Sequence, residues 1–233
     1  MPSCAGPATV GRGPVDAWPA TGHNTPMTSN RLEAFSDGVL AIVITIMVLE
    51  MKVPHGTEAA ALRPLLPVFA TYVLSFIYLG IYWNNHHHLF QAVQHVTGAA
   101  LWANLHLLFW LSLIPFVTGW MGENHLAPLP VALYGIVLLG AAVAYRVLTW
   151  TLLAHHGRES VLARALGRDR KGKASVVAYL LAISLAAVSV WPPVALYVAV
   201  ALWWLIPDPR VERTLARADP VAGGTDAARE RRR

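Results

Sequence analysis

The chain has 233 residues, of which 55% are hydrophobic and only 13% are charged, whereas soluble domains carry about 25% charged residues. Lysines and arginines gather in residues 158–173 and 210–233, and long stretches elsewhere carry almost no charge. This composition excludes an ordinary soluble domain and predicts a polytopic membrane protein. The net charge of +5 does not indicate nucleic-acid binding, because the positive charges flank apolar spans. Cys4 is the only cysteine, which excludes an intramolecular disulfide and a thiolate metal cluster.

The N-terminal segment, residues 1–30, is rich in proline, glycine, threonine and alanine and contains no apolar run. It lacks the basic start and the apolar core of a signal peptide. Two interpretations stay open. The segment is a disordered tail, or translation starts at Met27 and the preceding residues do not belong to the native protein.

Six apolar segments follow, and each predicts a transmembrane helix. They cover residues 32–53, 65–83, 99–120, 129–153, 174–191 and 194–206. At 1.5 Å per residue, the first four can cross a hydrocarbon core of about 30 Å, the fifth is marginal and the sixth is short. Pro192 and Pro193 predict a tight turn between the last two spans. The predicted fold is all-α, with one six-helix transmembrane domain over residues 31–206 and a basic tail over residues 207–233.

The distribution of positive charge predicts the orientation in the membrane. The loop 155–173 carries six lysines and arginines, and the tail after residue 206 carries seven arginines, so both are expected in the cytoplasm. Two crossings between them and four crossings before them place the N-terminus in the cytoplasm as well. The predicted location is the cell membrane, with both termini on the cytoplasmic side.

An ionisable residue, Asp37, lies within the first apolar segment. Such a residue costs at least a few kcal/mol in lipid unless it is paired or hydrated. Either residues 31–37 lie in the cytoplasmic interface, where Glu33 and Asp37 only start a helix, or Asp37 has a polar partner on a neighbouring helix.

Three stretches of the sequence carry a resemblance to a known family. They are Arg31-x-x-x-Phe35-Ser36-Asp37 at the start of the first span, residues 82–90 at the end of the second, and residues 102–106 on the third. Over residues 31–206 the chain resembles the endosomal and lysosomal potassium channels and their bacterial homologues. The resemblance implies an ion channel rather than an enzyme, with potassium as the permeant ion and no cofactor. It also implies a homotetramer with the first helix of each chain around the pore, because the motif occurs once in this sequence, as in bacterial members with one six-span unit.

A candidate pore face lies on the first helix. Ile42, Ile46 and Leu49 are separated by four and three residues, so they share one face, and Thr45 lies beside it. Four copies would form stacked apolar rings with a ring of hydroxyls between them. A narrow apolar constriction can gate by dewetting, and it favours potassium because potassium sheds water more readily than sodium. By resemblance, Ile42 forms the narrowest ring and Thr45 contributes selectivity.

Two further points concern the mechanism of conduction. The sequence contains no Thr-Val-Gly-Tyr-Gly segment, which excludes a filter of backbone carbonyls, and a leak-type conductance is expected. Aliphatic residues at helical spacing also occur on lipid-facing helices. Periodicity alone therefore does not decide whether this face lines a pore.

The motif residues away from this face are expected to form a structural network. They are Arg31, Phe35, Ser36, Asp37, His87 and His106. Asp37 projects more than a quarter-turn away from Ile42, so we expect it and Ser36 to bond polar groups of neighbouring helices. His87 and His106 are the candidate partners of Asp37, and the sequence does not distinguish them.

Histidines at positions 86–88, 95 and 106 form the densest polar cluster. Three consecutive helical residues point about 100° apart and cannot face one ion, so no metal site is predicted. Two interpretations of these histidines stay open. They lie at the membrane interface, or their titration makes conduction depend on pH. Two rival functions also stay open: a proton channel or cation transporter that uses Asp37 and the histidines as a relay, and a membrane-bound redox or metal enzyme.

Arg146 lies within the fourth predicted span. We expect it to extend toward the basic loop or to pair with an acidic residue of another helix. A single arginine does not make a voltage sensor, so little voltage dependence is expected.

Overall fold

The structure is a computed structural model that describes residues 29–93, 96–156 and 169–206. The elements in these ranges are α1 (Ser29–Leu49), η1 (Ala59–Leu65), α2 (Leu66–Gln91), α3 (Gly98–Ser112), α4 (Ile114–Glu123), α5 (Pro128–His156), α7 (Arg170–Leu185) and α8 (Trp191–Leu205). All of them are helices, which confirms the predicted all-α fold for the described part of the chain.

Four helical segments are long and apolar enough to cross a membrane. They are Ser29–Leu49, Ala59–Gln91, Gly98–Glu123 and Pro128–His155. These segments overlap the first four predicted spans, although α1 ends at Leu49, four residues before the predicted end of the first span at Val53. The N-terminal segment before Ser29, most of the basic loop and the tail from residue 207 lie outside the described residues.

Helix α2 continues about two turns beyond the predicted end of the second span. The sequence predicts that end at Trp83, before the polar stretch 84–88, whereas the helix runs to Gln91. Polar side chains can end a membrane span without ending a helix, and neither glycine nor proline interrupts residues 84–91. The three consecutive histidines therefore point in different directions from one continuous helix.

The predicted third span is built of two helices, α3 and α4, that meet at Leu113. Pro115 lies in the first turn of α4. The missing N–H of proline is tolerated there, because the first amides of a helix have no intrahelical partner. The prediction of one continuous helix over 99–120 is therefore corrected to a broken one.

Helices α7 and α8 begin and end at other residues than the predicted fifth and sixth spans. The chain turns at residues 186–190, and Pro192 and Pro193 lie in the first turn of α8 instead of in the connection. Proline suits this position because its fixed φ is already helical. With 16 and 15 residues, α7 and α8 are about 24 and 22 Å long, shorter than an average hydrocarbon core.

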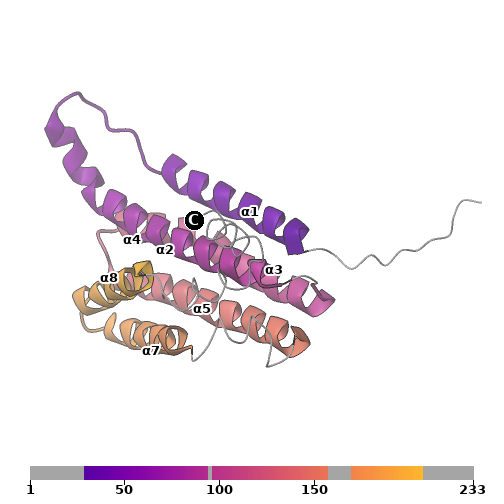
Figure 1. Cartoon of the computed structure of the whole chain (residues 1–233). Coiled ribbons are helices and arrows are strands. Elements are labelled where there is room, and N and C mark those ends of the chain that lie inside the picture. Colours follow the sequence, from indigo (N-terminus) through magenta and orange to yellow (C-terminus); the bar gives the residue numbers. More distant parts are fainter. Residues whose placement is uncertain (1–28, 94–95, 157–168, 207–233) are drawn as a thin grey trace, which may run out of the picture.

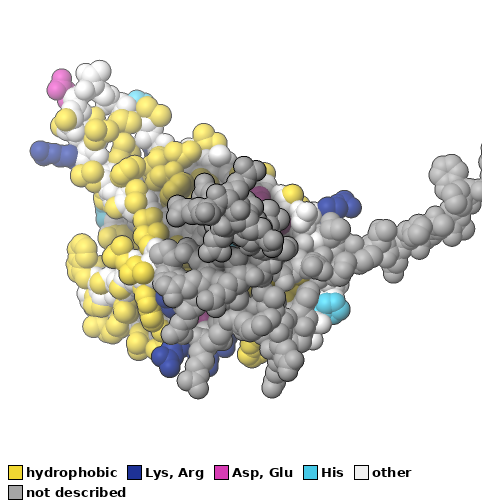
Figure 2. All heavy atoms as spheres, viewed as in Figure 1, with side chains coloured by type: hydrophobic (Ala, Val, Ile, Leu, Met, Phe, Trp, Pro, Cys, Tyr) yellow, Lys and Arg dark blue, Asp and Glu magenta, His cyan; other side chains and the backbone are white. Residues whose placement is uncertain are grey.

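The helices form a bundle with α1 at one edge and the α7–α8 pair at the opposite edge (Figure 1). Helix α1 packs against α2, α3 and α4, whereas α7 packs against α5 and α8, and α8 packs against α2 and α5 as well. The link that contains η1 extends beyond the other helices (Figure 1, upper left). Hydrophobic side chains cover most of the visible face over α2 and α8 (Figure 2). The arrangement leaves one side of α1 without a partner in the described chain.

Polar contacts in the core hold the helices in one register. Ser75 Oγ of α2 lies 2.6 Å from Thr118 Oγ1 of α4 and 3.0 Å from the hydroxyl of Tyr134 on α5. The hydroxyl of Tyr78 donates to the carbonyl of Tyr197 on α8 at 2.7 Å. Since an unpaired polar group is costly in a medium without water, these bonds favour one specific packing of α2 against its neighbours.

Candidate functional site

One face of helix α1 packs against the rest of the chain. Its buried side chains recur every three or four residues, as expected for a single helical face. They are Ser29, Leu32, Ser36, Leu40, Val43 and Met47. This buried face fixes the rotation of α1 about its own axis, and hence the direction in which the opposite face points.

A buried network of hydrogen bonds fastens α1 to α2 and α3. The side-chain amide of Asn104 donates to Ser36 Oγ at 2.9 Å, and Ser36 donates to the carbonyl of Leu32 at 2.9 Å. Asn104 Oδ1 lies 2.8 Å from His86 Nε2. Ser36 and Asn104 are fully buried and His86 is 2% exposed. Ser36 thus bonds a polar group of a neighbouring helix, which is the kind of contact the motif led us to expect.

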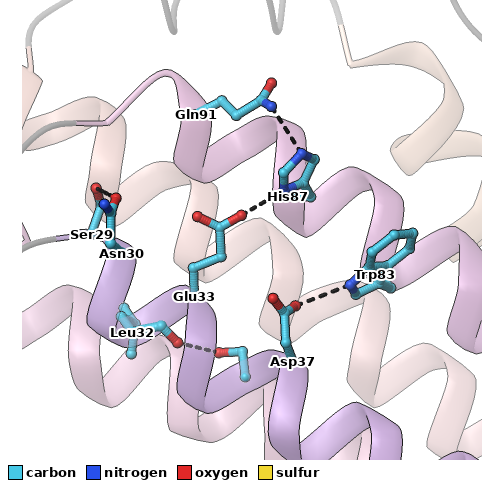
Figure 3. Close-up of polar contacts among 9 residues, drawn as sticks. Ser29, Asn30, Leu32, Glu33, Asp37, Trp83, His87 and Gln91 are labelled. Carbon is cyan, nitrogen blue, oxygen red and sulfur yellow. Dashed lines mark hydrogen bonds and ion pairs between the residues drawn. The ribbon is translucent and has the colours of Figure 1, made fainter.

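Asp37 has a different partner from the two that the sequence suggested. The indole Nε1 of Trp83 on α2 donates to Asp37 Oδ1 at 3.0 Å (Figure 3). His87 instead contacts Glu33, with its Nδ1 2.5 Å from Glu33 Oε1. The reason is the antiparallel packing of α1 and α2: His87, one turn after Trp83, lies level with Glu33, one turn before Asp37. The expected pairing of Asp37 with a histidine is therefore wrong.

The Glu33–His87 contact continues to a third side chain. Gln91 Nε2 lies 2.8 Å from His87 Nε2 (Figure 3). A ring that carries its proton on Nδ1 donates to Glu33 and accepts from the Gln91 amide, so both ring nitrogens of His87 have a partner. Together with the Asp37–Trp83 bond, this row fastens the N-terminal end of α1 to the C-terminal end of α2.

His106 does not take part in these contacts. It accepts a hydrogen bond from Trp110 Nε1, one turn later on its own helix, at 3.0 Å. Among the described residues, no group of three histidine, cysteine or acidic side chains is placed to hold a metal ion.

The opposite face of α1 is open. Ile42 is 60% exposed, Ile46 42% and Leu49 80%, and the side chain of Thr45 is exposed between them. Thr45 Oγ1 donates to the carbonyl of Ile42 at 2.8 Å. Because this bond uses the hydroxyl proton, the oxygen lone pairs remain free to accept, which suits a cation rather than an anion.

A cavity of about 310 Å³ lies at the C-terminal end of α1, between the start of α2 and helix α4. Glu50 and Glu123 contribute carboxylates to its lining, next to the aromatic rings of Tyr72 and Trp120. Lys52 forms an exposed ion pair with Glu123 at 2.8 Å, which connects the link after α1 to α4. Glu123 is therefore balanced by Lys52, whereas Glu50 forms no ion pair with another described residue.

Arg146 pairs with an acidic residue at the start of another helix, which is one of the two expected arrangements. Its Nη1 lies 2.7 Å from Oδ2 of Asp169, and the guanidinium also lies over the ring of Trp150, 5.6 Å from the ring centroid. Asp169 in turn caps α7 by accepting from the amide of Gly172. The pair therefore joins α5 to the first turn of α7.

Sequence reasoning missed the network residues Glu33, Trp83, His86 and Asn104. Trp83, His86 and Asn104 lie within the stretches 82–90 and 102–106 that carried the family resemblance. The sequence thus marked these stretches as important. Which side chains pair across two helices depends on how the helices are rotated and shifted along their axes relative to each other, and a single sequence does not give this.

Comparisons with known proteins agree on one family. Residues 31–115 match the family model described as endosomal/lysosomal potassium channel TMEM175. The chain is 54% identical over 189 residues to a potassium channel of Chryseobacterium sp. (strain P1-3), covering 81% of this chain and 98% of that protein. It is 38% identical over 98 residues to the endosomal/lysosomal proton channel TMEM175 of Homo sapiens, covering 37% of this chain and 19% of that protein. The fold is similar to the crystal structure of a lysosomal potassium-selective channel TMEM175 homologue from Chamaesiphon minutus, with a TM-score of 0.65 and 28% identity over 76% of this chain and 96% of that chain.

Proposed function

We propose, since this chain belongs to the family of the endosomal/lysosomal potassium channel TMEM175, that it is a homotetrameric, potassium-selective leak channel of the cell membrane. The family consists of ion channels, not enzymes. Helix α1 of each subunit lines the pore in this proposal, and the rest of the chain holds α1 in place.

The observation that carries the proposal is a continuous exposed stripe along the whole of α1. It consists of Arg31, Phe35, Gly38, Ile42, Thr45 and Leu49. The spacing alternates between four and three residues, a repeat of 3.5 that keeps one seam of a helix in contact with copies of itself. A face that only meets lipid has no need of an arginine, a glycine and a threonine in one row. Four such stripes around an axis supply both a seam and a lumen.

The proposed constriction is formed by Ile42, with Ile46 and Leu49 above it toward the C-terminal end of α1. A ring of branched aliphatic side chains forces a cation to shed water, and potassium does so at lower cost than sodium. Thr45 follows Ile42 by about one turn, and its free lone pairs replace part of the lost hydration. In this mechanism the chain selects by dehydration and hydroxyl oxygens, with no ring of backbone carbonyls.

The proposed topology has six crossings with both termini in the cytoplasm. Helices α1 to α5 supply four crossings by length alone. The α7–α8 pair supplies the remaining two as a short hairpin, and the positive charge before α7 and after α8 supports a cytoplasmic location for both of its ends. The carboxylate-lined cavity at the C-terminal end of α1 then lies at the external mouth.

A proton-conducting channel is the second candidate, because vertebrate relatives are named proton channels and His86 lies fully buried in the α1 network. A relay through Asp37 and the histidines is less supported: Asp37 bonds to Trp83, whereas His87 and His106 have other partners. Permeation through an apolar constriction therefore remains the better-supported mechanism.

The test is ion-replacement electrophysiology on the purified protein in planar bilayers. With potassium on one side and sodium on the other, the proposal predicts a reversal potential close to the potassium equilibrium potential, and a steady current without a pH gradient. A reversal potential that follows the proton gradient would favour the second candidate, and flux that requires a fixed counter-ion would indicate a transporter.

A further inference from the structure

The first turn of α7 and the end of α8 form a basic region on the side of the bundle opposite to α1 (Figure 1). One of its cations, Lys171, is fixed by the fold. Its Nζ donates to the carbonyls of Ile206 at 2.8 Å and Trp203 at 3.3 Å, and lies 5.7 Å from the ring centroid of Trp204. Lys171 therefore satisfies the C-terminal carbonyls of α8 and is occupied within the chain.

The second fixed cation is Arg146, which is held by Asp169 and Trp150. The two remaining cations, Arg170 and Lys173, are exposed, and neither forms a hydrogen bond or an ion pair with another described residue. Asp169 is the only acidic residue in the segments 128–156 and 169–206. The region thus has an excess of positive charge that the described chain does not balance.

The free cations stand at one end of an apolar face. Arg170 and Lys173 are three residues apart and share the outward face of α7, on which Val177, Leu180 and Leu181 follow, all about half exposed. The buried residues of α7 lie on the other side, toward α5 and α8. Lys and Arg side chains gather at the lower edge of Figure 2, where α7 begins. The face thus combines two cations at its start with an aliphatic surface along about the next two turns.

Tryptophans place the charged end of this face at the surface of the membrane. Trp150, Trp203 and Trp204 all lie close to the fixed cations, and two of them stack against those cations. Indole rings and basic residues at one level are typical of the membrane–water interface. The aliphatic part of α7 then extends into the hydrocarbon core of the same leaflet.

We propose that this face binds an anionic phospholipid of the cytoplasmic leaflet. Arg170 and Lys173 hold the phosphate of the headgroup, and the acyl chains lie along Val177, Leu180 and Leu181. A phospholipid is the occupant because its charge and its length match the two parts of the face, whereas a free phosphate would use only the first part. The proposal is inferred from the charge and the exposure of the side chains of α7, and it does not depend on which ion the channel conducts.

The test compares lipid binding by the purified full-length protein. Delipidated protein is titrated with phosphatidylglycerol or phosphatidylcholine, and bound lipid is counted by native mass spectrometry. The wild type is expected to prefer phosphatidylglycerol. Arg170→Gln and Lys173→Gln should each weaken that preference about fivefold, because one basic residue near an anionic headgroup contributes about 1 kcal/mol.

Arg63→Gln is the matched control, since Arg63 is an exposed cation on η1, far from α7 along the chain. It should leave the preference unchanged. The thermal stability of the α7 variants in phosphatidylcholine should equal that of the wild type, because neither side chain bonds another residue of the described ranges. An unchanged preference in the double variant would overturn the proposal. Displacement of phosphatidylglycerol by millimolar inorganic phosphate would also overturn it, by identifying the ligand as the free anion.

Discussion

The two faces of helix α1 differ in what surrounds them, although they belong to the same apolar segment. The inward face is buried and tied to α2 and α3 through Ser36 and Asp37. The outward face carries Ile42 and Thr45, which are exposed, and the hydroxyl of Thr45 bonds the carbonyl of Ile42 on its own helix. The inward face therefore fixes the position of α1 in the subunit, and the outward face is available for assembly and conduction.

This difference separates two kinds of consequence. Changes on the inward face should alter the stability of the fold, because they remove bonds that exist within one chain. Changes on the outward face should leave the stability of a single chain nearly intact and alter ion flow. The following substitutions test the separation.

The largest effect is expected for Asn104→Leu on the inward side. The substitution removes the shared partner of Ser36 and His86. His86 Nε2 is left buried without its partner, at a cost of about 1–3 kcal/mol, and Ser36 keeps only its bond to the carbonyl of Leu32. Thermal unfolding in detergent should show a lower Tm than the wild type. Asn124→Leu is the control, because that exposed asparagine only bonds a carbonyl on its own helix. Equal Tm values for the two variants would contradict the network.

Ile42→Asn should produce the next largest effect, on the outward face. The amide side chain of asparagine binds water within the constriction and so lowers the free-energy barrier to ion passage. Each reduction of about 1.4 kcal/mol in that barrier raises the ion flux about tenfold. Single-channel recordings in bilayers measure the change. The control is Val143→Asn, a similarly exposed aliphatic position on α5 that the proposal places away from the axis. A current equal to that of the wild type would place the constriction elsewhere.

Thr45→Ala should have a moderate effect that is confined to selectivity. Loss of the hydroxyl removes one oxygen per subunit from the ring that replaces potassium hydration, and a loss of about 0.7 kcal/mol reduces the potassium-to-sodium permeability ratio about threefold. Reversal potentials under bi-ionic conditions report this ratio. Tm should not change, since Thr45 bonds only the backbone of its own helix.

Trp83→Phe should have the smaller of the two effects on stability. It removes the hydrogen bond to Asp37, which is only partly buried, and should lower the free energy of unfolding by about 1 kcal/mol. Trp102→Phe is the matched control, because Trp102 is 75% exposed. A destabilisation as large as that of Asn104→Leu would mean that Asp37, rather than Ser36, is the main anchor of α1.

The sequence predicted the helical class and the four long spans because apolar composition and length determine them directly. It misplaced the ends of α2 and α8, since an asparagine–histidine stretch continues a helix as readily as it ends a span, and a proline pair begins a helix as readily as it ends one. The motif around Ser36 and Asp37 was recognisable, but its partners were not. Whether Trp83 or His87 lies level with Asp37 is decided by how two helices are packed against each other, and composition and periodicity do not report it.

The most direct measurement for the central claim is a density map of the assembled protein in lipid nanodiscs. The account predicts four subunits around an axis, with α1 of each innermost and the Ile42 side chains closest to that axis. A map in which the Ile42 side of α1 faces lipid, and another helix surrounds the axis, would contradict it.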